Sequence, residues 1–596
     1  MSNKQKMIII MIITATITCL AIGSTFAYWT WSTSSAQATS VTFTVASGFT
    51  CSADGGGNIT SSDVELVPAE CTNSTYAIKR TVKVSTTQDS GKTIYLDMKL
   101  KVDSISANLA ASENFKYALT TSSTSCESGI MAEGTFNGTS ANDELPLLTK
   151  EQYLSSTSND TFYLWVWLDK KETNSNTQNQ AFKLSLTGSC ADQEPAKTYA
   201  PWGSEVDMYK RIDFSQVSSS SNGQGLYVFK PTANDTNPVY YYRGAVTDNN
   251  VLFGGFCWKI VRTTETGGTK LIYNGVPVSG ECTATTGTDT QLASTSNFNS
   301  SINSPAYVGY MYGTIYTYSF KSSSKLATSY KYGNSFGYNG SSYTLVDTID
   351  SSGDWVTDYN TLNNNHYTCF NTTGTCSSLY YIYYTTSSRA YYITLTNGKS
   401  VEQALDEMFT NTTSSVIKTA IDSWYTTNLG AYEASLEDTV WCNDREIYQL
   451  GGWDANGGNT VSNYELYFAS YKRVTVTYYP SLKCNPNDSF TKNSGNGNGK
   501  LANPIGLITS DEAMLAGGRQ GTGNSTYYLY INQFYWLGSP NFFSGNALEW
   551  HVPPAGHLNS ANVNNTYGVR PSVSLKPGGT WSGSGTSSDP YTVSYS

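Results

Sequence analysis

The chain has three histidines, and two of them lie near a glutamate in the sequence EWHVPPAGH at residues 549–557. Histidine and glutamate could bind zinc together, and zinc proteases place two histidines one turn apart on a helix with a glutamate between them. Here His551 and His557 are further apart, and the two prolines between them prevent a helix. We therefore expect no metal site at this segment.

Two other patterns contain groups that catalytic sites use. Asp511 and Glu512 are adjacent carboxylates, but neighbouring side chains on a helix diverge, and TSDE at residues 509–512 is typical of a helix capping box. GNSFG at residues 333–337 matches the G-x-S-x-G motif, which requires an apolar strand before the serine and a helix after it. Tyrosine, serine and asparagine surround Ser335 instead. We find no convergent catalytic set and predict that the chain is not an enzyme.

The composition favours strands and turns over helices. Of 596 residues, 14% are charged and 13% are aromatic, with 45 tyrosines and 50 glycines. A formal net charge of −10 and the lack of a basic cluster argue against a nucleic-acid partner. A chain of this length is too long for one hydrophobic core, so we expect two or three domains.

The N-terminus indicates export. Lys4 and Lys6 precede an apolar segment at residues 7–27 that ends in Thr-Phe-Ala, a pattern typical of a secretory signal peptide. The segment almost reaches the length of a membrane-spanning helix, so an uncleaved N-terminal anchor is the alternative. We expect a secreted or cell-surface protein that contacts a membrane only through residues 7–27, if these are retained.

The cysteines indicate disulfides. Eleven occur, and because Cys19 lies in the apolar segment, an even number remains after it. Pairing by nearest neighbours gives Cys51–Cys71, Cys126–Cys190, Cys257–Cys282, Cys369–Cys376 and Cys442–Cys484. The sequence alone does not determine this connectivity. No C-x-x-C pair occurs, so we expect no metal site from the cysteines, and we predict no cofactor.

Residues 41–190 show the alternation of apolar and polar side chains that buries one face of a strand. In IYLDMKLKV at residues 94–102, every even position is apolar. The sequence TFYLWVWL at residues 161–168 is apolar on both faces and suits a central strand. Several such strands, separated by serine, asparagine and glycine, indicate an antiparallel β-sandwich.

The second half combines strands with helices. Two apolar segments at residues 251–262 and 270–275 flank a Gly-Gly turn and indicate a hairpin. Helices are expected at residues 400–409, at 414–428 and from Thr509 onward, and strands at 527–531, 535–537, 546–552 and 569–575. We therefore predict a mainly β fold with α+β character, in which an antiparallel β-sandwich precedes an α+β domain.

These patterns suggest an order of domains along the chain. We expect a signal peptide or anchor at residues 1–27, a β-sandwich domain at 28–195, a proline- and serine-rich linker at 196–238, an α+β domain at 239–577 with an insertion of strands and loops at about 300–398, and a C-terminal tail at 578–596.

Two sets of motifs resemble known families. The junction GSTFAYW at residues 23–29, followed by VTFTV at 41–45, resembles that of the camelysin-like biofilm-fibre proteins of Bacillota, whose signal peptides are cut by a dedicated signal peptidase. LITSDE at 507–512, YWLGSP at 535–540 and GVRPSVSL at 568–575 resemble an uncharacterised W-x-x-S-P and G-V-R-P domain family of exported Bacillota proteins. This second resemblance implies a C-type-lectin-like fold, similar to that of formylglycine-generating enzymes.

The sequence departs from these families at important positions. Residue 538 is Gly where the family usually has Arg, which removes a buried charge. The calcium-ligand motifs of sugar-binding C-type lectins do not occur, and Cys484 is the last cysteine, so the C-terminal cysteine pair of the oxidase members is missing as well. The resemblance therefore implies neither calcium-dependent sugar binding nor that oxidation.

The lectin-like resemblance implies a ligand-binding face in the long loop before the last strand, here residues 539–568. The candidate residues combine aromatic rings with hydrogen-bonding groups. They are Asn541, Phe542, Phe543, Trp550, His551 and His557. The alternative is that the rings cover the core.

We expect a non-catalytic recognition or adhesion protein whose partner is an extracellular glycan or protein. The alternatives are a structural subunit of an extracellular matrix fibre, which would self-associate, and a secreted hydrolase.

Overall fold

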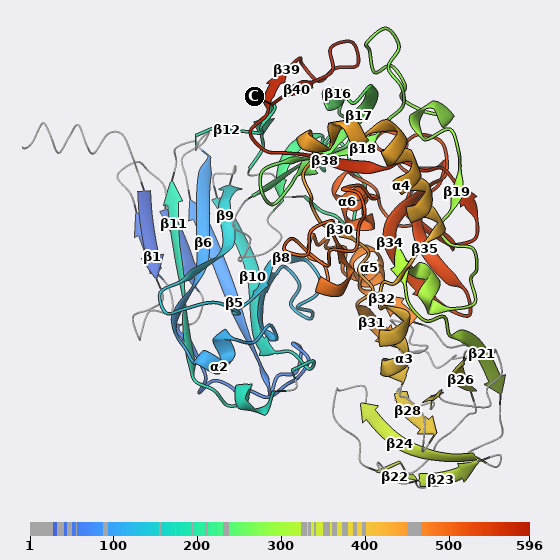
Figure 1. The fold of residues 1–596 in the computed structure, drawn as a ribbon. Coiled ribbons are helices and arrows are strands. Elements are labelled where there is room, and N and C mark those ends of the chain that lie inside the picture. Colours follow the sequence, from blue (N-terminus) through green and yellow to red (C-terminus); the bar gives the residue numbers. More distant parts are fainter. Residues whose placement is uncertain are drawn as a thin grey trace, which may run out of the picture. The chain divides into compact units, whose positions relative to one another are not determined.

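The computed structural model forms two compact units, which are described separately (Figure 1). Unit 1 comprises Met1–Thr198 with Met208–Arg211 and Thr232–Asp235, and unit 2 comprises Tyr199–Asp207, Ile212–Pro231 and Thr236–Ser596. The structure describes residues 28–32, 41–44, 50–54, 57–87, 93–153, 157–172, 174–191, 196–208, 212–229, 238–322, 330–331, 335–338, 341–349, 358–359, 366–371, 380–384, 390–395, 401–450 and 466–595. The apolar segment at 7–27 lies outside them.

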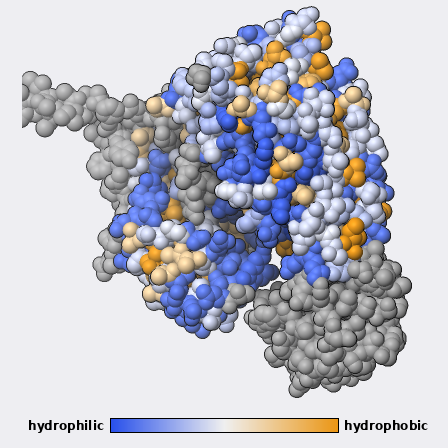
Figure 2. Space-filling view, viewed as in Figure 1, coloured by the Kyte–Doolittle hydropathy of each residue, from blue (hydrophilic) through white to orange (hydrophobic). Residues whose placement is uncertain are grey.

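Antiparallel strands dominate both units, and helices are few, which confirms the mainly β, α+β class. The more specific sandwich and lectin-like assignments stay predictions. Across the described ranges, we find no helix with the length and apolar character needed to span a membrane. On the face shown in Figure 2, hydrophilic residues cover most of the coloured surface, and hydrophobic residues form small scattered groups.

Unit 1 contains two antiparallel sheets. The first has the order β1 (Tyr28–Ser32), β11 (Phe182–Ala191), β6 (Ile94–Ile105), β9 (Glu144–Tyr153), with β4 (Ile59–Thr60) also paired to β11. The second has the order β2 (Val41–Thr44), β3 (Thr50–Asp54), β5 (Ala77–Thr87), β10 (Thr157–Leu168), β7 (Phe115–Thr120), β8 (Ile130–Thr135). One short helix, α2 (Ala107–Ala110), begins at the N-cap Ser106.

A single hydrophobic cluster joins the two sheets of unit 1. The even-numbered apolar residues of β6, from Ile94 to Val102, are at most 1% exposed, as the alternation predicts. Strand β10 is buried on both faces: Phe162, Leu164, Val166 and Leu168 enter this cluster, whereas Trp165 and Trp167 pack in a second cluster with Cys71 and Cys126. The expectation of a central strand apolar on both faces is confirmed.

The disulfide pairing in unit 1 differs from the nearest-neighbour expectation. Cys71 is bonded to Cys126, with the Cα atoms 6.3 Å apart, so neither Cys51–Cys71 nor Cys126–Cys190 forms. The reason is topological: Cys71 precedes β5 and Cys126 follows β7, and these two strands flank β10. Cys190 also forms a disulfide.

The expected Cys257–Cys282 and Cys442–Cys484 bridges are confirmed in unit 2, with Cα separations of 5.5 and 5.7 Å. The side chains of the expected Cys369–Cys376 pair lie outside the described part of the structure.

Unit 2 contains two sheets that position the candidate sites. One has the order β14 (Gly225–Phe229), β15 (Val239–Arg243), β17 (Phe256–Thr263), β18 (Thr269–Tyr273), β38 (Ser572–Leu575), with β16 (Asn250–Phe253) paired to β17. The other has the order β31 (Ile447–Leu450), β32 (Leu466–Phe468), β34 (Tyr535–Phe543), β35 (Ala547–Val552), β36 (Asn559–Asn562). A third sheet, in the expected insertion, has the order β21 (Thr317–Ser322), β26 (His366–Asn371), β27 (Tyr380–Tyr384), β28 (Ala390–Leu395), β24 (Ser341–Ile349), β23 (Ser335–Tyr338).

Short strand pairs complete unit 2: β19 (Ser296–Asn297) with β37 (Thr566–Tyr567), β20 (Met311–Tyr312) with β29 (Thr413–Ser414), β22 (Tyr330–Lys331) with β25 (Asp358–Tyr359), β30 (Trp441–Cys442) with β33 (Ser489–Phe490), and β39 (Thr580–Ser582) with β40 (Thr592–Ser594). A further pair joins β12 (Thr198–Tyr199) and β13 (Glu205–Val206). The helices are α3 (Val401–Met408), α4 (Val416–Asn428), α5 (Ala469–Tyr471) and α6 (Ser510–Leu515). The expected helices and the β17–β18 hairpin are confirmed.

Three expectations for unit 2 are wrong or incomplete. Residues 527–531 form no strand, because the Leu529 carbonyl accepts hydrogen bonds from Arg570 and Tyr535 side chains instead of a neighbouring strand. The expected linker contains β14, an edge strand of the first sheet. The expected tail forms β39 and β40, and its Tyr591 is 5% exposed and bonded to the backbone of β16.

Candidate functional site

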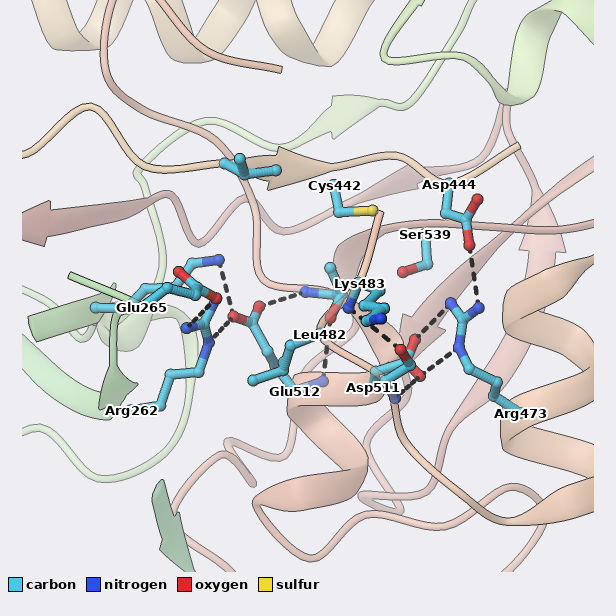
Figure 3. Close-up of a pocket in the computed structure, with 14 residues that line it drawn as sticks. Arg262, Glu265, Cys442, Asp444, Arg473, Leu482, Lys483, Asp511, Glu512 and Ser539 are labelled. Atoms are coloured by element: carbon cyan, nitrogen blue, oxygen red, sulfur yellow. Dashed lines mark hydrogen bonds and ion pairs between the residues drawn. The ribbon is translucent and has the colours of Figure 1, made fainter. Parts of the chain in front are cut away.

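Charged side chains gather in one pocket of unit 2, shown in Figure 3. The hairpin β17–β18 supplies Arg262 and Lys270, the π-helix Lys472–Thr477 after α5 supplies Arg473, and the first turn of α6 supplies Asp511 and Glu512. The space open to the centre of a water-sized sphere is about 20 Å³, which is enough for a water molecule. We call these five residues the charged pocket.

Two cationic side chains bind Glu512, which lies in the first turn of α6. Its Oε1 lies 2.6 Å from Arg262 Nε and 2.8 Å from Lys270 Nζ, and its Oε2 accepts a hydrogen bond from the Thr509 backbone N–H at 2.9 Å. Burial alone would raise the pKa of Glu512, but the charges of Lys270 and Arg262 outweigh it and lower this pKa to about 2. Thr509 and Glu512 also complete the expected capping box, which is confirmed.

Asp511 faces a different partner. Arg473 donates to both of its carboxylate oxygens, at 2.6 and 3.1 Å, and to Asp444 at 3.0 Å (Figure 3). Burial disfavours the charged form of Arg473. The two carboxylates, Asp511 and Asp444, outweigh burial and raise the pKa of Arg473. Burial also raises the pKa of Asp444, and Arg473 only partly opposes this shift. Asp511 and Glu512 therefore diverge, as the sequence predicts, and belong to separate ion clusters.

The charged pocket has the properties of a structural site. Each of its five ionisable groups is bound to an opposite charge. Buried ion pairs of this kind orient the elements that carry them, here α6 against the β17–β18 hairpin. In the described part of the chain, no three His, Cys, Asp or Glu side chains are arranged as metal ligands.

Arg570 of the GVRP motif is an interior residue that bonds several segments together. The side chain is 1% exposed and donates to the carbonyls of Tyr273 and Leu529 and to Asn274 Oδ1, at 3.0, 3.2 and 3.0 Å. Its guanidinium also lies 5.0 Å from the Tyr535 ring centre. Arg570 therefore joins β18 to the irregular segment before β34.

The structure places most of the expected ligand-binding residues inside the protein. Asn541, Phe543, Trp550 and His551 are at most 2% exposed, and only Phe542 and His557 are partly exposed. The reason is that β34 and β35 are inner strands of their sheet rather than a loop. This burial supports the alternative in which the rings cover the core, and ligand contact at residues 539–568 stays a prediction.

An exposed aromatic stack lies at the edge of that segment. Phe534, which directly precedes β34, is 39% exposed and stacks on Tyr567 of β37, with ring centres 4.8 Å apart and planes 15° from parallel. The buried His551 ring lies 5.0 Å from Tyr567, and the buried Trp536 ring lies 4.7 Å from it. We call Phe534 and Tyr567 the aromatic surface.

Polar backbone and amide contacts hold the aromatic surface in place. Asn565 Nδ2 donates to the Tyr567 hydroxyl at 3.1 Å, and Thr566 Oγ1 donates to Asn297 Oδ1 at 3.1 Å. Gly568 follows Tyr567, and a Cβ at this position would lie 2.8 Å from the Phe534 carbonyl and clash with the Gln291 side chain. The glycine of the GVRP motif thus allows the chain to pass beside Phe534.

The aromatic surface was not among the expected site residues. The sequence feature that could have indicated this surface is an apolar ring, Phe534, directly after the turn-forming residues Asn532 and Gln533. In the structure, Asn532 has a left-handed φ of 55°. Sequence reasoning considered the aromatic residues after Ser539 and did not weigh this turn.

Comparison with family models, curated proteins and solved structures gives no match for this chain.

Proposed function

We propose that this chain is an extracellular recognition or adhesion protein that binds a ligand through the aromatic surface of unit 2 and does not transform it. The exposed, stacked ring of Phe534 carries the proposal. A ring that is already held by Tyr567 loses little conformational freedom when a ligand covers it, so the contact retains more of its binding energy.

Two other features support this role. The disulfides suit an oxidising compartment outside the cytosol. The ionisable groups of the charged pocket are paired with opposite charges, which favours a structural role for that pocket.

A glycan array and a pull-down from host mucus, both with the full chain produced under oxidising conditions, test the proposal. We expect a ligand whose binding weakens in Phe534→Ala and is unchanged in Tyr432→Ala. Tyr432 is a matched control because it is 43% exposed and also packs against one aromatic ring, that of Phe253.

The proposal fails if no ligand is found by either method, or if the folded protein cleaves a substrate. Assembly into fibres without ligand binding would favour the structural-subunit alternative instead.

A further inference from the structure

We infer that the ligand of the aromatic surface is a neutral sugar ring of a glycan, recognised without a metal ion. This inference rests on the proposed function and names the ligand class at the same site. Its first support is the shape of the surface: Phe534 and Tyr567 are nearly parallel, at 15°, and Phe534 presents a rigid exposed ring. The flat C–H face of a pyranose packs on such a ring.

The second support is the type of polar group around the rings. Asn532 and Thr566, both exposed, lie two residues or fewer along the chain from Phe534 and Tyr567. Asn565 is bonded to the Tyr567 hydroxyl. Amides offer a donor and an acceptor side by side, which matches neighbouring sugar hydroxyls.

The third support is the lack of full charge. Between residues 527 and 569, the Asp, Glu, Lys, Arg and His side chains are Glu549, His551 and His557 alone. Glu549 is fully buried, burial lowers the pKa of His551 to about 4, and burial also lowers the pKa of His557. Both imidazoles are therefore neutral at pH 7. A sulfated, sialylated or phosphorylated ligand would find no counter-charge in this stretch.

A protein partner fits the surface less well. Protein interfaces are anchored by aromatic residues together with arginine, and they need a wide covered area. Arg570, two residues after Gly568, is 1% exposed and bonded to interior carbonyls. A single ring with an amide border matches one sugar unit better than a protein epitope.

The test compares ligand classes on the full chain. The probes are neutral oligosaccharides of glucose, galactose, mannose and N-acetylglucosamine, sulfated and sialylated forms of the same backbones, and mucin stripped of its glycans. We expect binding to a neutral probe that persists in EDTA and in 0.5 M NaCl, on the order of tenfold weaker binding in Phe534→Ala, and retained binding in Phe534→Trp. Tyr432→Ala is the control, and thermal unfolding checks that each variant folds.

The possible outcomes test the neutral-sugar inference separately from the proposed recognition function. Preference for a charged probe, loss of binding in salt or EDTA, or Phe534-dependent binding to stripped mucin would overturn the neutral-sugar inference while leaving recognition intact. Binding to a neutral probe that Phe534→Ala leaves unchanged would show that the site is wrong. Absence of binding to every probe would overturn the neutral-sugar inference, and it would overturn the proposed function as well only if the mucus pull-down also yields no ligand.

Discussion

Arg445 and Glu549 attract each other inside unit 2 without a hydrogen bond between them. Arg445 is already engaged: it donates to Asp488 through Nε at 3.0 Å and through Nη2, to the Met311 carbonyl at 2.9 Å and to Asn411 Oδ1 at 2.5 Å. Glu549 is 0% exposed, and neither of its carboxyl oxygens has a hydrogen-bond partner in the described part of the chain. Burial raises the pKa of Glu549 well above its usual range, and the charge of Arg445 only partly opposes this.

Glu549 is expected to make unit 2 less stable as the pH rises. Below about pH 4.5 both folded and unfolded chains hold the proton, whereas above it the unfolded chain releases the proton and the folded chain keeps it, so the free energy of unfolding falls. Glu549→Gln should leave stability unchanged at pH 4 and raise it by about 1–3 kcal/mol at pH 8. Urea unfolding at both pH values measures this. Glu281→Gln, at an exposed position, is the control, and an equal effect at both pH values would contradict the prediction.

Glu512 is expected to have the opposite pH dependence. Its folded pKa of about 2 lies below the ordinary 4.5, so its stabilising contribution is present above pH 4.5 and is lost as the pH falls towards 2, by about 3 kcal/mol in all. At pH 7, Glu512→Gln should lower the free energy of unfolding by about 3–5 kcal/mol, because Arg262 and Lys270 remain buried without their carboxylate.

The matched control for Glu512 is Glu265→Gln. Glu265 also binds Arg262, at 3.1 Å, but its side chain is 50% exposed, so its loss should cost less than about 1 kcal/mol. Comparable losses in the two variants would show that burial does not decide the strength of these pairs.

His551 is expected to cause part of any acid unfolding. Its pKa is lowered by burial to about 4 from 6.5, so the unfolded chain takes up a proton at higher pH than the folded chain does. This difference adds about 3 kcal/mol to the free energy of unfolding above pH 6.5, and this stabilisation is lost as the pH falls through 4. His551→Gln should remove this dependence in unfolding curves between pH 7 and 4. His557→Gln should change it less, because His557 is partly exposed, and equal effects would contradict the assignment.

The Cys71–Cys126 bridge predicts how two cysteine substitutions combine. Cys71→Ser, Cys126→Ser and the double variant should each lower the free energy of unfolding by about the same 2–4 kcal/mol, because each removes the same disulfide. Additive losses would instead place the two cysteines in separate bridges. Thermal unfolding and titration of free thiols in denaturant distinguish these results, since the double variant should have no thiol left by the lost bridge, whereas two separate bridges would leave two.

Local signals in the sequence predicted much of the fold. Alternation identified the buried residues of β6 because a strand turns successive side chains to opposite faces. The capping box at Thr509 and Glu512 predicted where α6 begins, because both partners lie within one turn. The disulfide of Cys71 was mispredicted because its partner is close only through the order of β5, β10 and β7 in the sheet.

The candidate site was harder to predict for the same reason. Trp550 and Phe543 have the composition of a binding loop, but β34 and β35 are flanked by other strands, which buries both residues. The exposed Phe534 meets Tyr567 because Gly568, which follows Tyr567, donates a hydrogen bond to the Phe534 carbonyl, although the two segments lie far apart in the sequence. No pattern within either segment predicts that contact.

The pairing of β18 with β38 has a consequence for synthesis of the protein. Leu271 lies opposite Val573, so β18 gains this neighbour only after the ribosome has made β38, far downstream in the sequence (Figure 1). Arg570, which bonds the Tyr273 carbonyl, arrives equally late. A polypeptide released before this point would leave the edge of β18 open to other chains. Proteases and chaperones that recognise open strand edges would therefore bind chains that stop before β38 in preference to chains that contain it.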